Sequence, residues 1–194
     1  MVVIGFLKIV VVAAISLVLG LLVSRYVLAH ASPFDRVRLG AWRLEAHAGS
    51  MEADPFTRAR VARTGEIPLA VGEGLQWIAR TDDAGRPLNA GCTYAVGPKA
   101  PEARYWTISV VTPDGFPIVN PAGRYGFRSS ELLRSSNGDF TIIVSATPQP
   151  GNWLPVDAPG GFKLALRLYD APLGATPAAM DPTSAPRVDK ISCR

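Results

Sequence analysis

The stretch Phe162-Lys163-Leu164-Ala165-Leu166-Arg167-Leu168-Tyr169 decides the fold class of this chain. Every second residue is phenylalanine or leucine, and the residues between them include Lys163 and Arg167. Alternation with a period of two is the pattern of a β-strand that buries one face and exposes the other. The stretch therefore predicts a strand over residues 162–169 with a leucine face in a hydrophobic core.

Turn-forming residues divide the other apolar runs into short segments. The chain has 17 prolines and 18 glycines among its 194 residues. Many turns between short apolar runs favour an all-β sandwich or barrel over a helical bundle. We expect further strands over residues 75–81, 92–96, 104–112, 116–120 and 140–145, and a surface tail from residue 171 onward.

One short helix is expected over residues 54–64. Asp54 is a residue type that caps helix N-termini, and Pro55 suits the first helical position. Gly65 supplies the residue type that ends helices in a left-handed conformation. These signals predict a helix that is bounded at both ends.

The N-terminal segment, residues 1–29, is strongly apolar and carries no charge from Ile9 to Ser24. About 20 helical residues at 1.5 Å each span the hydrocarbon core of a bilayer. The segment predicts a transmembrane anchor or uncleaved signal. The alternative is a signal peptide that is cleaved after Ala29-His30-Ala31, and we favour the anchor.

Two features of the sequence predict opposite orientations of this anchor in the membrane. Arg25, Arg36 and Arg38 follow the segment, and the positive-inside rule would place the following domain in the cytoplasm. The cysteine pair and the signal-like N-terminus favour export instead. We expect a single-pass protein of the inner (plasma) membrane with its C-terminal domain outside the cytoplasm. Residues 30–52 are interpreted as a connector in which Trp42 packs onto the domain, and residues 53–194 as the β-sandwich.

The chain contains two cysteines, Cys92 and Cys193. In an oxidising compartment they are expected to form one disulfide, which would close a loop of about 100 residues and contribute up to ~4–5 kcal/mol. The alternative is two unpaired thiols. With only His30 and His47 in addition, the chain lacks the ligand spacing of a zinc site, so we predict no metal and no cofactor.

The formal net charge is +4, and the basic residues gather early in the chain. This distribution is compatible with anionic lipid headgroups nearby, and equally with a solvated arginine-rich face. No basic stripe interleaved with aromatic residues is present, so nucleic acid is not an expected partner.

Several motifs taken together resemble the family catalogued as domain of unknown function 1214. They are Ala53-Asp54-Pro55-Phe56-Thr57-Arg58, Ala62-Arg63-Thr64-Gly65, Asp83-Ala84-Gly85-Arg86-Pro87-Leu88, Cys92-Thr93-Tyr94, Ala103-Arg104-Tyr105-Trp106-Thr107, Asn120-Pro121, Arg124-Tyr125, Asn152-Trp153-Leu154-Pro155 and Leu166-Arg167-Leu168-Tyr169. The resemblance runs from about residue 42 to 193. It implies a jelly-roll-like antiparallel β-sandwich and, in short members, one N-terminal membrane segment. It implies no settled activity.

Catalytic motifs are weak in this sequence. There is no Gly-x-Ser-x-Gly motif, and neither histidine lies in the expected β domain, which argues against a Ser-His-Asp triad. Carboxylates for glycoside hydrolysis exist, but most lie in turns where aspartate has a local hydrogen-bonding role. These carboxylates are Glu73, Asp82, Asp83, Asp114 and Asp139. We predict no catalytic residue and lean towards a protein that is not an enzyme.

A set of arginine, asparagine and aromatic residues is the best candidate for a ligand-binding patch, because guanidinium groups and rings suit sugars and anionic groups. The set is Arg104, Trp106, Arg124, Tyr125, Asn152, Trp153, Arg167 and Tyr169. The alternative is that these side chains tie loops to strands and fill the edge of the core.

Three functions follow from these observations. The first is an exported, membrane-anchored module that binds an envelope polymer or a protein partner. The second is a carbohydrate-active hydrolase or lyase that uses carboxylates. The third is a structural subunit of a membrane assembly.

Overall fold

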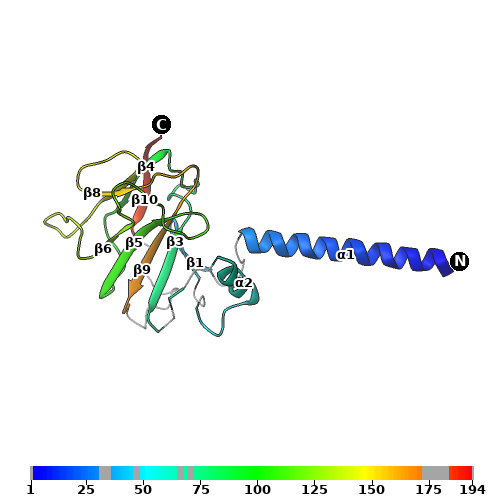
Figure 1. Cartoon of the computed structure of the whole chain (residues 1–194). Helices are drawn as coiled ribbons and strands as arrows, with labels where there is room; N and C mark the ends of the chain where they lie inside the picture. The colour runs from blue at the N-terminus through cyan, green and yellow to red at the C-terminus, as the bar shows by residue number, and fades with distance from the viewer. Residues whose placement is uncertain are drawn as a thin grey trace.

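The computed structural model describes residues 2–30, 36–45, 49–64, 68–69, 72–171 and 184–193. It has an N-terminal helix, α1 (Val2–His30), that extends away from a β domain (Figure 1). Within α1, the 24 residues Ile4–Val27 have no buried side chain and form a helix long and apolar enough to cross a membrane. At 1.5 Å per residue this segment is about 36 Å long, which exceeds the thickness of a bilayer's hydrocarbon core.

The β domain consists of two sheets. The larger has six strands in the order β1-β2-β3-β9-β5-β6, and the smaller has four in the order β10-β4-β7-β8. Neighbouring strands are antiparallel except β7 and β8, which are parallel. The strands are β1 (Arg36–Leu39), β2 (Trp42–Glu45), β3 (Gly74–Ala79), β4 (Cys92–Gly97), β5 (Tyr105–Val111), β6 (Gly126–Arg128), β7 (Ile142–Ser145), β8 (Asn152–Pro155), β9 (Lys163–Tyr169) and β10 (Arg187–Cys193). The predicted mainly β class is confirmed.

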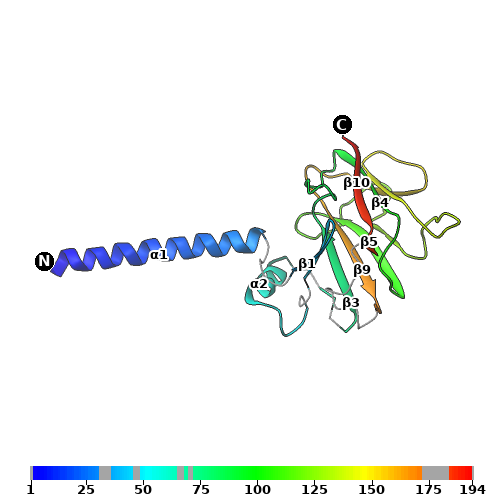
Figure 2. The same ribbon diagram turned by 180° about the vertical axis from the view of Figure 1, so that it is seen from behind.

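The hydrophobic core lies between the two sheets and is organised around β9, a central strand of the larger sheet (Figure 2). Leu164, Leu166 and Leu168 are at most 1% exposed, as the period-two pattern predicted. They share the core with Val144 and Leu154 of the smaller sheet. The leucine face of residues 162–169 is therefore the core face of the domain.

The prediction that residues 30–52 form a connector is wrong in part. Arg36–Leu39 and Trp42–Glu45 pair as a hairpin at the edge of the larger sheet, so the sandwich begins before residue 53. Trp42 packs onto the domain as predicted: it is 1% exposed, and its Nε1 donates a hydrogen bond to the Pro186 carbonyl oxygen at 2.6 Å. Each strand of the hairpin has only four residues, too few for alternation to stand out from chance.

The expectations for the chain's later segments also need correction. Residues 116–120 form no strand: Pro117 makes one isolated bridge to Val111, because proline cannot donate to a ladder. Beyond residue 171, where a surface tail was expected, β10 pairs with β4 and buries Val188 completely. Residues 172–183 of that expected tail lie outside the described residues. Strand β8 was not expected.

The predicted helix 54–64 is confirmed as α2 (Pro55–Thr64). Asp54 Oδ1 accepts hydrogen bonds from the backbone nitrogens of Phe56 at 2.9 Å and Thr57 at 3.1 Å, which satisfies donors of the first helical turn. Gly65, the expected terminator, lies outside the described residues.

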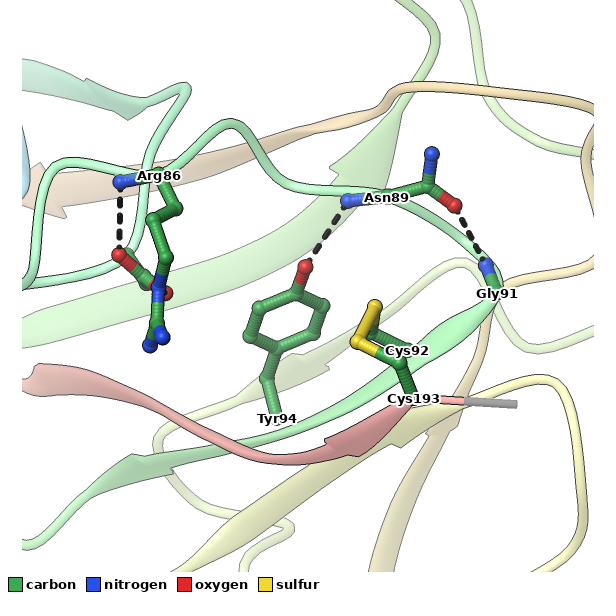
Figure 3. The surroundings of a disulfide bond; sticks show 7 residues. Arg86, Asn89, Gly91, Cys92, Tyr94 and Cys193 are labelled. Atoms are coloured by element: carbon green, nitrogen blue, oxygen red, sulfur yellow. Dashed lines mark hydrogen bonds and ion pairs between the residues drawn. A yellow bond between two sulfur atoms is a disulfide. The ribbon is translucent and has the colours of Figure 1, made fainter.

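Cys92 and Cys193 form a disulfide with an S–S distance of 2.05 Å (Figure 3). The two cysteines are opposite each other in the register of β4 and β10. The bond therefore joins two strands of the smaller sheet that are 101 residues apart in sequence. Nearby, the Tyr94 hydroxyl accepts a hydrogen bond from the Asn89 backbone nitrogen at 3.0 Å.

Candidate functional site

The face of the larger sheet that points away from the core carries a row of polar side chains. In the register of β3, β9, β5 and β6, Gln76 lies opposite Arg167, Arg167 opposite Thr107, and Thr107 opposite Arg128. Side chains that are opposite each other on one face of a sheet lie within contact range. The strand order thus assembles a polar row from four segments that are distant in sequence.

An open groove of about 600 Å³ lies over the β5–β6 end of this row. It is lined by strand residues and by the loop before β6. Its polar and aromatic lining residues are Thr107, Ser109, Arg124, Tyr125, Phe127, Arg128, Glu131 and Arg167. Three guanidinium groups and one carboxylate give the groove a positive balance, which is suited to an anionic group.

Arg167, unlike Arg128, has no carboxylate partner among the described residues of the groove. Its Nε donates a hydrogen bond to Gln76 Oε1 at 2.9 Å, which holds the side chain in place. No ion pair of Arg167 is formed among the residues that the structure describes. Its terminal nitrogens are therefore available to bind a carboxylate or phosphate in a forked geometry.

The loop wall of the groove is shaped by Asn120, which is buried. Its Nδ2 donates hydrogen bonds to the carbonyl oxygens of Ile118 at 3.1 Å and Arg124 at 2.9 Å, and its Oδ1 accepts one from the Arg124 backbone nitrogen at 3.2 Å. The Arg124 guanidinium lies 5.0 Å from the Phe127 ring centre and donates to the Trp153 carbonyl oxygen at 3.2 Å. These contacts position Arg124 on the groove.

Two other polar residues of the groove differ in whether their polar atoms have a partner. Arg128 pairs with Glu131, whose Oε1 lies 3.6 Å from the Arg128 Nε. The buried Ser109 hydroxyl has no hydrogen-bond partner in the described part of the chain. A buried hydroxyl without a partner is costly, so Ser109 is a polar group that the fold leaves unsatisfied beneath the groove.

The structure brings together only part of the sequence-predicted patch. Arg124, Tyr125 and Arg167 line the groove. Tyr169 lies on the same outer face, two residues from Arg167, and its ring centre is 5.7 Å from that of Tyr105. The aromatic pair therefore adjoins the polar row.

The other members of the predicted patch have structural contacts. Trp106 is 5% exposed and packs on Phe140 in the core, with ring centres 5.2 Å apart. Arg104 is a surface residue whose Nη1 lies 3.5 Å from Asp170 Oδ2. Trp153 is half-buried and donates to the Ser145 carbonyl oxygen at 3.0 Å.

Asn152 also has a structural role. It is 6% exposed and makes three hydrogen bonds to the backbone of Leu133 and Thr141, so its amide group is fully used inside the domain.

Sequence reasoning did not single out Thr107, Ser109, Arg128 or Glu131 as site residues. Thr107 and Ser109 have the alternating spacing of one strand face, which was a usable signal. Arg128 and Glu131 become neighbours of Arg167 only through the strand order, for which the sequence carries no local signal.

Two of the carboxylates considered for hydrolysis, Asp82 and Asp83, are engaged in structural contacts. Asp82 Oδ2 lies 2.8 Å from the Arg86 Nε. Burial raises the pKa of the Asp82 carboxyl, but hydrogen bonds and charge from Arg86, with a further bond from Ala84, lower the pKa more, so it lies below its usual value. Asp83 accepts hydrogen bonds from the backbone nitrogens of Ala41 and Val188. Among the described residues, no group of three or more metal-ligating side chains is present.

The fold and the groove define a two-sheet β protein preceded by an apolar helix. The chain belongs to the family described as "Protein of unknown function (DUF1214)", whose profile matches residues 73–173. The matched segment contains every residue that lines the groove.

Two solved structures are similar to this chain. The VPA0106 protein from Vibrio parahaemolyticus is 20% identical with a TM-score of 0.57, and the match covers 73% of this chain and 36% of that protein. An uncharacterised protein from Burkholderia cenocepacia is 16% identical with a TM-score of 0.46, with coverage of 86% and 39%. The chain thus spans well under half the length of either protein, and the Vibrio likeness shows the fold alone. No curated protein matched the chain significantly.

Proposed function

We propose that this chain is a membrane-anchored binding module of the cell envelope, and that its groove binds an anionic group carried by an envelope polymer or a protein partner. The observation that carries the proposal is Arg167. Its guanidinium is oriented by Gln76 and lies in an open groove with no described acidic partner. A preoriented guanidinium loses little conformational freedom when it binds a carboxylate or phosphate.

The proposed location is the plasma membrane, with the β domain outside the cytoplasm. The helix α1 is long and apolar enough to serve as the anchor. A disulfide between Cys92 and Cys193 supports an oxidising compartment, because cytosolic thiols are kept reduced. Intact-mass measurement of the chain from membranes, after alkylation of free thiols and with or without reduction, tests both points. Alkylation of both cysteines before reduction would argue for a cytoplasmic domain.

The binding test uses the full chain in mild-detergent micelles, titrated calorimetrically with polygalacturonate, with inorganic phosphate and with uncharged dextran. We expect heat of binding with the two anions and none with dextran. A hydrogen bond to a charged group contributes about 1.5–3 kcal/mol, so Arg167→Gln should weaken binding about 10- to 100-fold. Arg167→Lys keeps the charge but loses the fork, and should bind with intermediate affinity.

Arg104→Gln is the matched control, because it removes the same charge from an exposed pair outside the groove. It should bind as the wild type does. Ser109→Ala is a second control: it removes a buried hydroxyl that has no described partner, so neither the melting temperature nor the affinity should fall. Equal binding by wild type and Arg167→Gln, with both folded, would overturn the proposed function.

A further inference from the structure

A second basic surface lies at the opposite edge of the larger sheet, next to the end of α1. Strand β1 is the edge strand, and in both views β1 and α2 are the parts of the domain nearest to the C-terminal end of α1 (Figures 1 and 2). The chain between His30 and Arg36 can span at most about 20 Å. A membrane that contains α1 therefore has its surface close to this edge.

The outer face of the sheet at this edge carries Arg38, Arg43 and Arg80, which we term the basic edge. Arg38 and Arg43 are directly opposite each other in the register of β1 and β2. Arg43 is opposite Ile78, and Arg80 is two residues further along the chain. The basic edge is thus a cluster of like charges.

The positive charges of the basic edge repel one another, which lowers the stability of the isolated domain. Partial burial lowers the pKa of Arg43, and the charges of Arg38 and Arg80 lower this pKa further. Like charges opposite each other destabilise a sheet. The directly opposed pair Arg38 and Arg43 is therefore a suitable place for a contact with negative charge outside the domain.

Helix α2 adds further arginines next to α1. It contacts α1, and its sequence, PFTRARVART, has three arginines and no acidic residue. The Arg58 Nε donates to the Ala53 carbonyl oxygen at 2.8 Å, and Arg63 is exposed. Met51, just before α2, is 93% exposed, so a large apolar side chain stands beside basic ones on this surface. Basic and apolar side chains side by side are typical of surfaces that lie on anionic membranes.

We infer that the basic edge binds anionic lipid headgroups of the membrane in which α1 is anchored. Each arginine near an anionic surface strengthens the contact about fivefold. The contact would hold the domain against the bilayer along β1 and leave the groove at β6 free. This inference rests on the proposed anchoring of α1, which extraction of membranes with alkaline carbonate tests separately.

The experiment places the full chain in nanodiscs with equal amounts of phosphatidylglycerol and phosphatidylcholine. Native mass spectrometry then measures which lipids the released protein retains. We expect the wild type to prefer phosphatidylglycerol. Arg38→Gln with Arg43→Gln should reduce this preference about 25-fold, from the fivefold effect of each arginine. The double variant should melt at the same or a higher temperature, because it relieves repulsion.

The charge-matched control is Lys99→Gln with Arg104→Gln, which removes two exposed positive charges away from the basic edge. It should keep the preference within about twofold, because screening at physiological ionic strength limits the reach of a charge to about 8 Å. Arg25, at the end of the apolar segment, is unchanged in both variants. Equal retention of the two lipids by the wild type, or an equal loss of preference in both double variants, would overturn the inference.

Discussion

Replacement of Asn152 by alanine should destabilise the β domain by about 3 kcal/mol. The Asn152 Oδ1 accepts a hydrogen bond from the Leu133 backbone nitrogen at 2.8 Å, and its Nδ2 donates to the carbonyl oxygens of Leu133 at 2.8 Å and Thr141 at 3.1 Å. Each lost hydrogen bond costs about 1 kcal/mol, and an unsatisfied buried partner costs more. Leu133 and Thr141 have exposed side chains, so water can reach part of this region and the lower figure applies.

The assay is thermal unfolding of the full chain in mild detergent, followed by tryptophan fluorescence. For a domain of this size, 3 kcal/mol corresponds to a fall in melting temperature of about 6–12 °C. Asn137→Ala is the control, because among the described residues its amide bonds only Asp139, within an exposed turn, and it should cost less than about 1 kcal/mol. A stability loss below about 1 kcal/mol for Asn152→Ala, with weaker binding of polygalacturonate, would show that Asn152 contacts ligand and that our reasoning is wrong.

Three further predictions concern the disulfide, Asp82 and the groove wall. Reduction of Cys92–Cys193 should destabilise the domain by about 4 kcal/mol, because the bond closes a loop of about 100 residues; equal melting temperatures with and without reductant would contradict this. Since folding lowers the pKa of Asp82, its stabilising contribution is present above the unfolded pKa of about 3.9 and is lost as the pH falls through the folded value. Melting temperatures measured from pH 6 to pH 2 should therefore fall more steeply below about pH 4 in the wild type than in Asp82→Asn, and parallel curves would argue against it. A Cβ at Gly126 would lie 2.4 Å from the Ile108 carbonyl oxygen, so Gly126→Ala should displace β6 and weaken polygalacturonate binding in calorimetry. The control is Gly123→Ala, whose Cβ would meet no atom within 4 Å and which should cost only about 1 kcal/mol for its positive φ.

The parts of the fold that the sequence predicted are those in which local pattern and burial agree. Residues 162–169 alternate in sequence, and packing against the smaller sheet buries their leucine face. The opposite face is exposed only in part, because Lys163 and Ala165 are buried as well. Strand β10 escaped prediction because Val188 is its one buried apolar side chain, so its sequence carries almost no period-two signal. Its place depends on pairing with β4 about 100 residues away, which no short window contains.

For the candidate site, the sequence could predict which residues share a face of one strand, but not which residues of other strands lie beside them. The spacing of Arg167 and Tyr169 correctly placed both on one face of β9. The same reasoning grouped Arg104 with Trp106, but β5 begins at Tyr105 and turns Trp106 into the core, so the neighbours of Arg167 are Thr107 and Gln76. A shift of one residue in register exchanges the two faces of a strand, and register is set by tertiary pairing.

The two basic surfaces lie at opposite edges of one sheet, and this separation supports distinct roles for them. The order β1-β2-β3-β9-β5-β6 places five strand spacings between the edges, which is about 24 Å at the usual ~4.8 Å per strand. That distance is about three times the screening length at physiological ionic strength, so charges at one edge have little influence at the other. Arg167 lies nearer, because β9 is three strand spacings from β1, about 14 Å, so screening weakens but does not abolish the influence of the basic edge on an anion bound at Arg167. If the basic edge rests on the membrane as proposed, the groove is held at the far edge of the sheet, where a large envelope molecule can enter it without displacing lipid.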